Sequence, residues 1–289
     1  MIIDLHIHSK SSDGALTVDK VIREAKRRRI ALMSITDHDS IGSQEAAVKL
    51  ARQAGIRYVT GVELNVTFTH PRYREGKPVP LDFLGYQFDA TDKTLASKLE
   101  QMATYREERA AKIMGNINTE FEKEGISKLT TGNFAEIQAS VDGVLGRPHI
   151  ADYLVHKGIV KNRQEAFDRY LVKCDVPKFP LYLEEASRLV RNADGKLVLA
   201  HPNDPHGTSL VALTKSLPEQ AKIIVESMMA HIDGVECWHS RNDVQTTNHF
   251  VKIAKDNRLL LTGGSDCHQK PIIMGTIKMP EYVAKQFRL

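Results

Sequence analysis

Short apolar runs of strand length alternate along this chain with segments of helical periodicity. The strand-like runs lie at residues 2–7, 30–36, 57–66, 81–88, 196–200, 233–238 and 258–264. Amphipathic patterns at residues 18–29 and 43–54, and helical stretches near 210–229 and 243–256, lie between them. Strands that follow one another through helices favour a parallel sheet or barrel. The sequence therefore predicts an α/β fold with seven strands.

A helical insertion interrupts this pattern. Residues 97–180 begin with a long charged helical segment and continue with helical pieces around 149–157 and 163–173. We expect an insertion domain over 97–180 that lies across one end of a barrel formed by residues 1–96 and 181–289. The chain has 289 residues, of which 42% are hydrophobic and 26% charged, so it can bury the core that such a barrel requires.

Side chains that bind metals stand at the end of nearly every predicted strand. In (β/α) barrels the carboxyl ends of the strands meet on one rim, where active sites lie. One such residue is more often structural than functional, but their coincidence at so many strand ends predicts a metal site on that rim. The residues in question are His6, His8, Asp13, His38, Glu63, Asp82, His201, Asp266 and His268.

The residue types indicate which metals and which chemistry fit. Imidazole and carboxylate ligands suit manganese, iron and zinc, and a carboxylate such as Glu63 can bridge two ions. Two neighbouring ions can stabilise an in-line displacement at phosphorus. Asp37 and Asp39, on either side of His38, could orient the ligating imidazoles by hydrogen bonds. The pattern is thus typical of a multinuclear hydrolytic centre.

Composition argues against several other classes of protein. Three cysteines without paired spacing exclude a disulfide framework and a cysteine-rich zinc site. A net charge of +4 and an aromatic content of 6% argue against a nucleic-acid binder with a basic, aromatic surface. There is no signal peptide and no apolar run of roughly twenty residues. We therefore expect a cytoplasmic protein with no membrane association, and the sequence indicates no stable protein partner.

Five segments resemble, in their order along the chain, the motifs of the PHP (polymerase and histidinol phosphatase) family of metal-dependent phosphoesterases. They are DLHIHSKSSDG, ITDHDS, GVEL, AHP and GSDCH. The resemblance implies a distorted (β/α)7 barrel. It is closest to bacterial members with a helical insertion after the fourth strand, which hydrolyse 3',5'-nucleoside bisphosphates or trim short RNA from the 5' end. The stretches GRPHIADYL (146–154) and AFDRYL (166–171) match that insertion.

The resemblance implies a centre of two or three divalent ions, with Mn²⁺ as the first choice and Fe²⁺ or Zn²⁺ as alternatives. One ion would be held by His6, His8, Glu63 and Asp266. A second ion, bridged by Glu63, would use His201, and Asp82 stands where relatives have a histidine. A third would be held by Asp13, His38 and His268. A metal-bridging hydroxide, held by Glu63 and Asp266, would attack phosphorus.

The resemblance also implies contacts to a small phosphorylated substrate, a nucleotide or a short oligoribonucleotide. Arg147, in the insertion, would bind a phosphate by bidentate hydrogen bonds. Relatives have a Gly-Lys-rich segment where this chain has VKCDVPKF, and the loop at 68–80 is longer than expected. Further candidate contacts are Ser11, His149, Lys173, Lys178 and His239. Three alternatives remain open: a phosphatase of another small phosphomonoester such as histidinol phosphate, a cyclic phosphodiesterase, and a non-catalytic PHP module.

Overall fold

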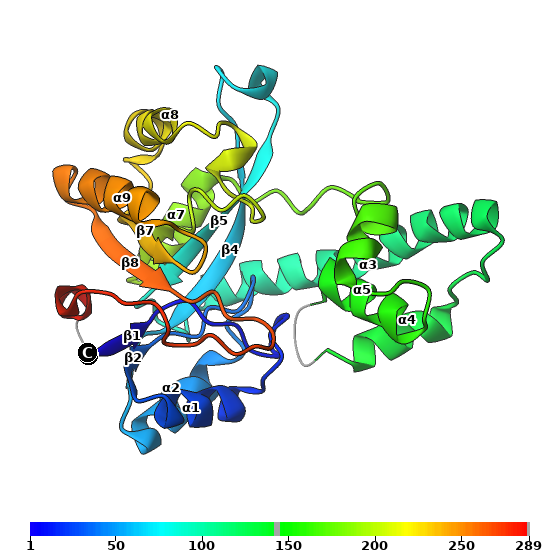
Figure 1. Ribbon diagram of the computed structural model, residues 1–289, viewed down its shortest axis with the longest axis horizontal. Coiled ribbons are helices and arrows are strands. Elements are labelled where there is room, and N and C mark those ends of the chain that lie inside the picture. The colour runs from blue at the N-terminus through cyan, green and yellow to red at the C-terminus, as the bar shows by residue number, and fades with distance from the viewer. Residues whose placement is uncertain (142–144, 288–289) are drawn as a thin grey trace.

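The computed structural model describes residues 1–141 and 145–287 and contains two β-sheets, flanking helices and a helical arm (Figure 1). The smaller sheet is parallel, with the strand order β1 (Ile2–Asp4), β2 (Ile30–Met33), β3 (Arg57–Tyr58). The larger sheet has the order β4 (Gly61–Phe68), β5 (Val79–Tyr86), β6 (Lys196–Leu199), β7 (Gly234–His239), β8 (Leu260–Gly264). The predicted α/β class is confirmed.

Strand β5 departs from the predicted parallel arrangement. It pairs antiparallel with both β4 and β6, whereas β6, β7 and β8 run parallel. Parallel neighbours need a crossover connection, usually a helix. Residues 69–78, between β4 and β5, contain only the 3-10 turn Arg74–Gly76, so the chain returns as a hairpin.

The two sheets are linked at both edges by backbone contacts. Beside β1, the Leu5 N–H donates to the Gly263 carbonyl at 3.1 Å, and Ile7 bridges Cys267 in parallel. Beyond β2, His38 forms a parallel bridge with Glu63 of β4. In place of one continuous barrel sheet, the strands thus form two sheets with bridged edges, and the predicted strand 57–66 is divided between them.

Amphipathic helices cover these sheets. They are α1 (Val18–Arg27), α2 (Gln44–Ala54), α7 (Leu183–Asn192), α8 (Leu217–Ile223) and α9 (Val244–Asp256). Helix α1 buries Val21, Ile22 and Ala25, as its spacing predicts. Helix α2 ends at Gly55, whose φ of 72° is the left-handed conformation that glycine adopts without strain. Short turns at Leu210–Ala212, Ile224–Met228 and Glu281–Gln286 complete this part.

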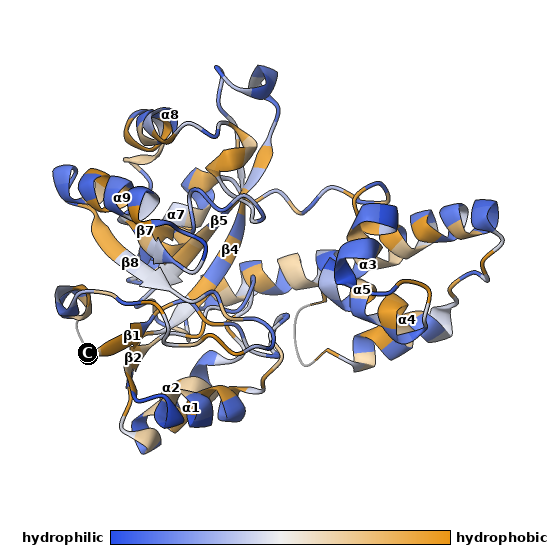
Figure 2. Ribbon diagram, viewed as in Figure 1, coloured by the Kyte–Doolittle hydropathy of each residue, from blue (hydrophilic) through white to orange (hydrophobic). Residues whose placement is uncertain are grey.

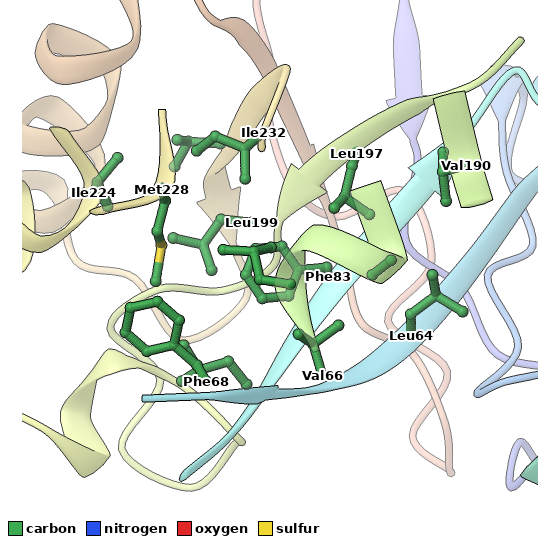
Figure 3. Close-up of a cluster of buried hydrophobic side chains, with 14 of the residues drawn as sticks. Leu64, Val66, Phe68, Phe83, Val190, Leu197, Leu199, Ile224, Met228 and Ile232 are labelled. Atoms are coloured by element: carbon green, nitrogen blue, oxygen red, sulfur yellow. The ribbon is translucent and has the colours of Figure 1, made fainter. Parts of the chain in front are cut away.

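The main hydrophobic core lies between the larger sheet and its helices. Figure 3 shows Val66 and Phe83 of neighbouring strands close to Leu199 and Met228, all at most 1% exposed. Burial of a side chain of this size stabilises the fold by about 1.5–3 kcal/mol. This core fixes the positions of β4 to β7. Several of the candidate ligands lie within these strands or directly after them.

The insertion forms an arm that projects away from the sheets (Figure 1). It consists of the 32-residue helix α3 (Lys93–Glu124), α4 (Thr131–Ala139), α5 (Arg147–His156), and α6 (Arg163–Ala166) with the π-helical turn Phe167–Leu171. In Figure 2 these helices carry apolar residues among polar ones, and the apolar ones form a separate core that includes Ile117, Phe121 and Tyr170. The predicted boundary at residue 97 falls inside α3. Within the described ranges, every helix is too short or too polar to span a bilayer.

Candidate metal centre

The strand ends bring the predicted ligands together in three groups. Within each group, one nitrogen or oxygen of every member lies within 4.8 Å of those of the others. The first group consists of His6, His8, Glu63 and Asp266. The second consists of Glu63, Asp82 and His201. The third consists of His8, Asp13, His38 and His268. These groups share members, so the nine side chains form one continuous cluster.

The first group has the spacing of ligands that share an ion. The Nε2 atoms of His6 and His8 lie 3.1 Å apart, and Oε2 of Glu63 lies 3.3 Å and 3.1 Å from them. Ligand atoms about 2.1 Å from one ion are separated by about 3.0–3.4 Å in octahedral or tetrahedral geometry. Yet in the described part of the chain this buried oxygen makes no hydrogen bond. The cluster therefore fits divalent cations better than protons.

The cluster combines buried charges of both signs. Burial alone would raise the pKa of Asp13, but the imidazoles of His268 and His38 hold it well below its ordinary value. Burial opposes protonation of His201 and His268, yet the neighbouring carboxylates raise their pKa values to about 9 and about 10. Metal ligands must be deprotonated, so a divalent cation would displace these imidazole protons.

Glu236 of β7 supports the cluster and was not predicted. Its Oε1 lies 3.0 Å from Nδ1 of His6, and its Oε2 accepts the backbone N–H of His201 at 2.7 Å. Burial raises the pKa of Glu236, but the imidazole of His6 reverses that shift and lowers it. The ionised carboxylate can only accept, so Nδ1 of His6 donates and leaves Nε2 free to ligate. An acidic residue inside the apolar run 234–238 was the available sequence signal.

Asp37 and Asp39 occupy different places from those expected. The Asp37 carboxylate accepts from the backbone and hydroxyl of Ser9, both at 2.7 Å, and from the Ser12 hydroxyl at 2.9 Å. The Asp39 carboxylate accepts the Asn65 N–H at 2.9 Å and pairs with Arg106 of α3. These carboxylates hold the loop after β1 and the base of the arm, not the imidazoles. The prediction that they orient ligating imidazoles was wrong in this respect.

Asp82 of β5 belongs to the second ligand group, together with Glu63 and His201. Asn65 donates a hydrogen bond from Nδ2 to its Oδ1 at 2.5 Å. Burial, and after it the negative charge of Glu63, raises the pKa of Asp82. Two buried carboxylates so close together repel each other unless a cation lies between them. Asp82 therefore lies where it can act as a metal ligand in place of the histidine that relatives have.

A cleft of about 540 Å³ opens above the cluster, between the sheets and the arm. Arg147 lines it from the first turn of α5, and its Nη1 is paired with Asp175 at 2.7 Å. Arg241, after β7, lines the other side and is paired with the buried Asp204 at 2.5 Å. Lys178 also lines the cleft, and burial lowers its pKa to about 8. The cleft is thus rich in cations and suited to an anionic ligand.

Of the other predicted substrate contacts, only His149 lines this cleft among the described residues. The neighbouring Ser12 lines it in place of Ser11. His239 lies deeper, with Nε2 at 3.3 Å from Oδ2 of Asp266, in a fourth metal-capable group with Asp204. Lys173 lies apart, with its Nζ at 2.6 Å from Glu120.

Several cations of the cleft were not predicted. Arg106 and Arg109 come from the long charged helix, where nothing in the sequence separates them from solvent-exposed arginines. Arg163, at the start of α6, is paired with Asp152 and also lines the cleft. Their position depends on how the arm lies over the sheets, which local sequence patterns do not encode.

Comparison with known proteins gives a consistent result. The family model described as the PHP domain matches residues 4–174. A 3',5'-nucleoside bisphosphate phosphatase from Chromobacterium violaceum is 30% identical over 274 residues, which cover 92% of this chain and 87% of that protein. A 5'-3' exoribonuclease from Haemophilus influenzae is 32% identical over 272 residues, which cover 92% and 89%. Both alignments span the sheets and the arm.

A solved structure of a metal-dependent phosphoesterase from Bifidobacterium adolescentis resembles the whole molecule. The TM-score is 0.80 at 26% sequence identity, and the match covers 98% of this chain and 94% of that one. The arm is therefore part of the shared architecture.

Proposed function

The chain belongs to the PHP domain family of metal-dependent phosphoesterases, and we propose that it removes the 3'-phosphate from nucleoside 3',5'-bisphosphates. The observation that carries this proposal is the position of the three ligand groups directly beneath a cleft lined by arginines of the arm. The ligand groups supply the hydrolytic chemistry, and the arginines of the cleft supply recognition of an anion.

The residues present fit two or three divalent ions, with Mn²⁺ preferred and Fe²⁺ or Zn²⁺ as alternatives. The holding residues would be those of the three groups, His6, His8, Asp13, His38, Glu63, Asp82, His201, Asp266 and His268. When bound, the ions would lower the pKa of a water molecule towards neutrality and neutralise charge on the phosphate. Glu63 belongs to two groups, so it is the residue suited to bridge two ions.

The protein's own groups orient the substrate. The guanidinium of Arg147 is held by Asp175 and lies over the ring of Phe167 at 5.4 Å, so its fork is preoriented for bidentate phosphate binding. Lys178 contributes a second positive charge to the same wall of the cleft. Ser12 offers a hydroxyl beside Asp13, fixed by its hydrogen bond to Asp37.

Cations on opposite walls of the cleft favour a substrate with two anionic groups. Arg147 and Lys178 come from the arm and the segment that follows it, and Arg241 comes from the loop after β7. A nucleoside 3',5'-bisphosphate carries phosphates at two ends of one ribose and can meet both walls. A single phosphomonoester such as histidinol phosphate would leave one wall without an anionic partner.

Product analysis tests the proposal. The protein loaded with Mn²⁺ is given adenosine 3',5'-bisphosphate, histidinol phosphate and a cyclic nucleotide at equal concentration. Inorganic phosphate is measured by a colorimetric assay, and the nucleotide products are separated by ion-exchange chromatography. We expect preferential conversion of the bisphosphate to the 5'-monophosphate. Release of the 5'-phosphate instead, or faster turnover of histidinol phosphate, would reject this substrate assignment.

A further inference from the structure

The three ligand groups differ in their proportion of nitrogen and oxygen donors. The first group offers two imidazoles and two carboxylates, and the third offers three imidazoles and one carboxylate. The second group, formed by Glu63, Asp82 and His201, offers one imidazole and two carboxylates. Imidazole suits zinc and iron, whereas carboxylate and water suit manganese and magnesium. The second group is therefore the one best suited to an ion that prefers oxygen ligands.

The single imidazole of the second group also lacks support. The Nε2 atom of His201 lies 2.9 Å from Oε1 of Glu63, but its Nδ1 is buried and has no hydrogen-bond partner in the described part of the chain. Each of the other groups contains an imidazole whose Nδ1 is held, His6 by Glu236 and His268 by a backbone carbonyl, both at 3.0 Å. Such a partner makes a ligating imidazole more basic. His201 should therefore be a weaker nitrogen donor than His6 or His268.

The Asp82 carboxylate is a fixed part of this group. Asp82 pairs with Asn65 across the β4–β5 ladder, and Nδ2 of Asn65 donates to its Oδ1 at 2.5 Å. The backbone N–H of Asn65 is in turn held by Asp39 at 2.9 Å. The side chain of Asp82 is only 6% exposed. The second group thus has a preoriented oxygen donor opposite Glu63.

An ion in the second group can be reached from solvent. Glu63, Asp82 and His201 all line the cleft above the cluster. Among the described residues, His6 and His8, which supply imidazoles to the first and third groups, do not line it. Water from the cleft can therefore complete the coordination of an ion in the second group, and water is a ligand that suits manganese.

We propose that the second group is an exchangeable site that retains manganese when zinc competes, so that a mixed supply of the two ions gives a mixed centre. Zinc binds more tightly than manganese to most sites with nitrogen and oxygen donors. The second group discriminates least against manganese, while the first and third groups take zinc. This inference rests on the proposed function, since both require ions in these groups, and it adds which ion each group takes.

Displacement of Mn²⁺ by Zn²⁺ tests the inference. The Mn²⁺-loaded protein is equilibrated by dialysis with rising free Zn²⁺ at constant free Mn²⁺, and both metals are measured per chain by elemental analysis. We expect all but one Mn²⁺ to be replaced first, and the last to need about 10–100-fold more Zn²⁺, the effect of an unsupported imidazole. The electron paramagnetic resonance spectrum between the two steps should be that of a single uncoupled Mn²⁺, because Zn²⁺ is diamagnetic. Loss of all Mn²⁺ over one range of Zn²⁺ would overturn the inference.

Variants of Asp82 locate the last Mn²⁺. Asp82→His exchanges an oxygen donor for an imidazole and should merge the two displacement steps into one. Asp82→Glu keeps the carboxylate and should keep both steps. Asp152→His, at an exposed position of α5 outside the ligand groups, adds the same imidazole as a control and should behave as wild type. A separate late step that persists in Asp82→His would place the retained Mn²⁺ in another group and overturn the inference.

These measurements use no substrate, so they distinguish this inference from the proposed function. Two displacement steps in a protein that releases no phosphate from adenosine 3',5'-bisphosphate would reject the proposed function alone. One displacement step in a protein that does release it would reject the mixed centre alone. A protein that binds neither Mn²⁺ nor Zn²⁺ would reject both.

Discussion

The Nδ1 atom of His6 lies 3.0 Å from Oε1 of Glu236, and both side chains are fully buried. His6 lies just after β1 and Glu236 lies in β7, and their contact directs the other nitrogen of His6 towards His8 and Glu63. The same glutamate accepts the backbone N–H of His201. One carboxylate that is not itself in a ligand group thus orients two residues that are.

Replacement of Glu236 should weaken metal binding without removing a ligand. Loss of such a supporting carboxylate typically costs about 10–100-fold in metal affinity. We expect this loss for Glu236→Ala and a smaller one for Glu236→Gln, whose amide oxygen can still accept from His6. Competition of the protein with a chromogenic chelator for Mn²⁺ measures the affinity. Equal affinities of Glu236→Ala and wild type would show that His6 needs no support.

Removal of Asp82 should cost one ion per chain. Asp82 joins Glu63 and His201 in one group and takes no part in the other two. We therefore expect Asp82→Asn to bind one Mn²⁺ fewer than wild type, as measured by elemental analysis after equilibrium dialysis. Asp37→Asn, a change to another buried carboxylate outside the ligand groups, serves as the control and should keep the full number. An unchanged count in Asp82→Asn would remove Asp82 from the site.

Two cations of the arm should differ sharply in their effect on turnover. Arg147 lines the cleft, whereas Lys173 is paired with Glu120 and does not line it among the described residues. Arg147→Ala should lower kcat/KM for the bisphosphate by about 10–100-fold, as expected for the loss of a charge-assisted bidentate contact. Lys173→Ala should stay close to wild type. The opposite ranking of the two variants in steady-state kinetics would contradict the placement of the arm.

The stability of the metal-free protein should depend on the protonation of His268. Burial opposes its charge, but Asp13 and Asp266 raise its folded-state pKa from 6.5 to about 10. A pKa raised on folding contributes stability that is fully present below pH 6.5 and is lost as the pH rises through 10. Urea unfolding of chelator-treated protein should show a difference between wild type and His268→Gln that shrinks as the pH rises. A difference that grows with pH would contradict this sign.

Most ligands of the cluster could be predicted from the sequence, because each of them follows or lies in a recognisable strand. His6, Glu63 and His201 could be placed on one rim from strand order alone. The direction of β5 could not be predicted, because it depends on whether the chain crosses over the sheet or turns back. The resemblance to relatives with the same insertion identified Arg147, whose position otherwise follows from the packing of the arm.

The roles of Asp37 and Asp39 show a second limit. His38 lies in the cluster, but the side chains of its two neighbours contact Ser9 and Arg106 instead. The chain turns at Asp39, whose φ of 46° is left-handed, so residues 37–39 do not form a continuous strand. Asp37 and Asp39 were therefore assigned as partners of the imidazoles only because they are adjacent to His38 in sequence. The residue that does orient an imidazole, Glu236, is distant in sequence from His6.

Metal content and hydrolysis, followed together in one titration, test the central claim most directly. Chelator-treated protein is titrated with Mn²⁺, and bound metal and release of phosphate from adenosine 3',5'-bisphosphate are measured at each step. We expect no hydrolysis without metal, and activity that rises as two or three ions bind per chain. Hydrolysis by the metal-free protein, or no bound Mn²⁺ and no activity at saturation, would contradict a metal-dependent phosphoesterase built on this cluster.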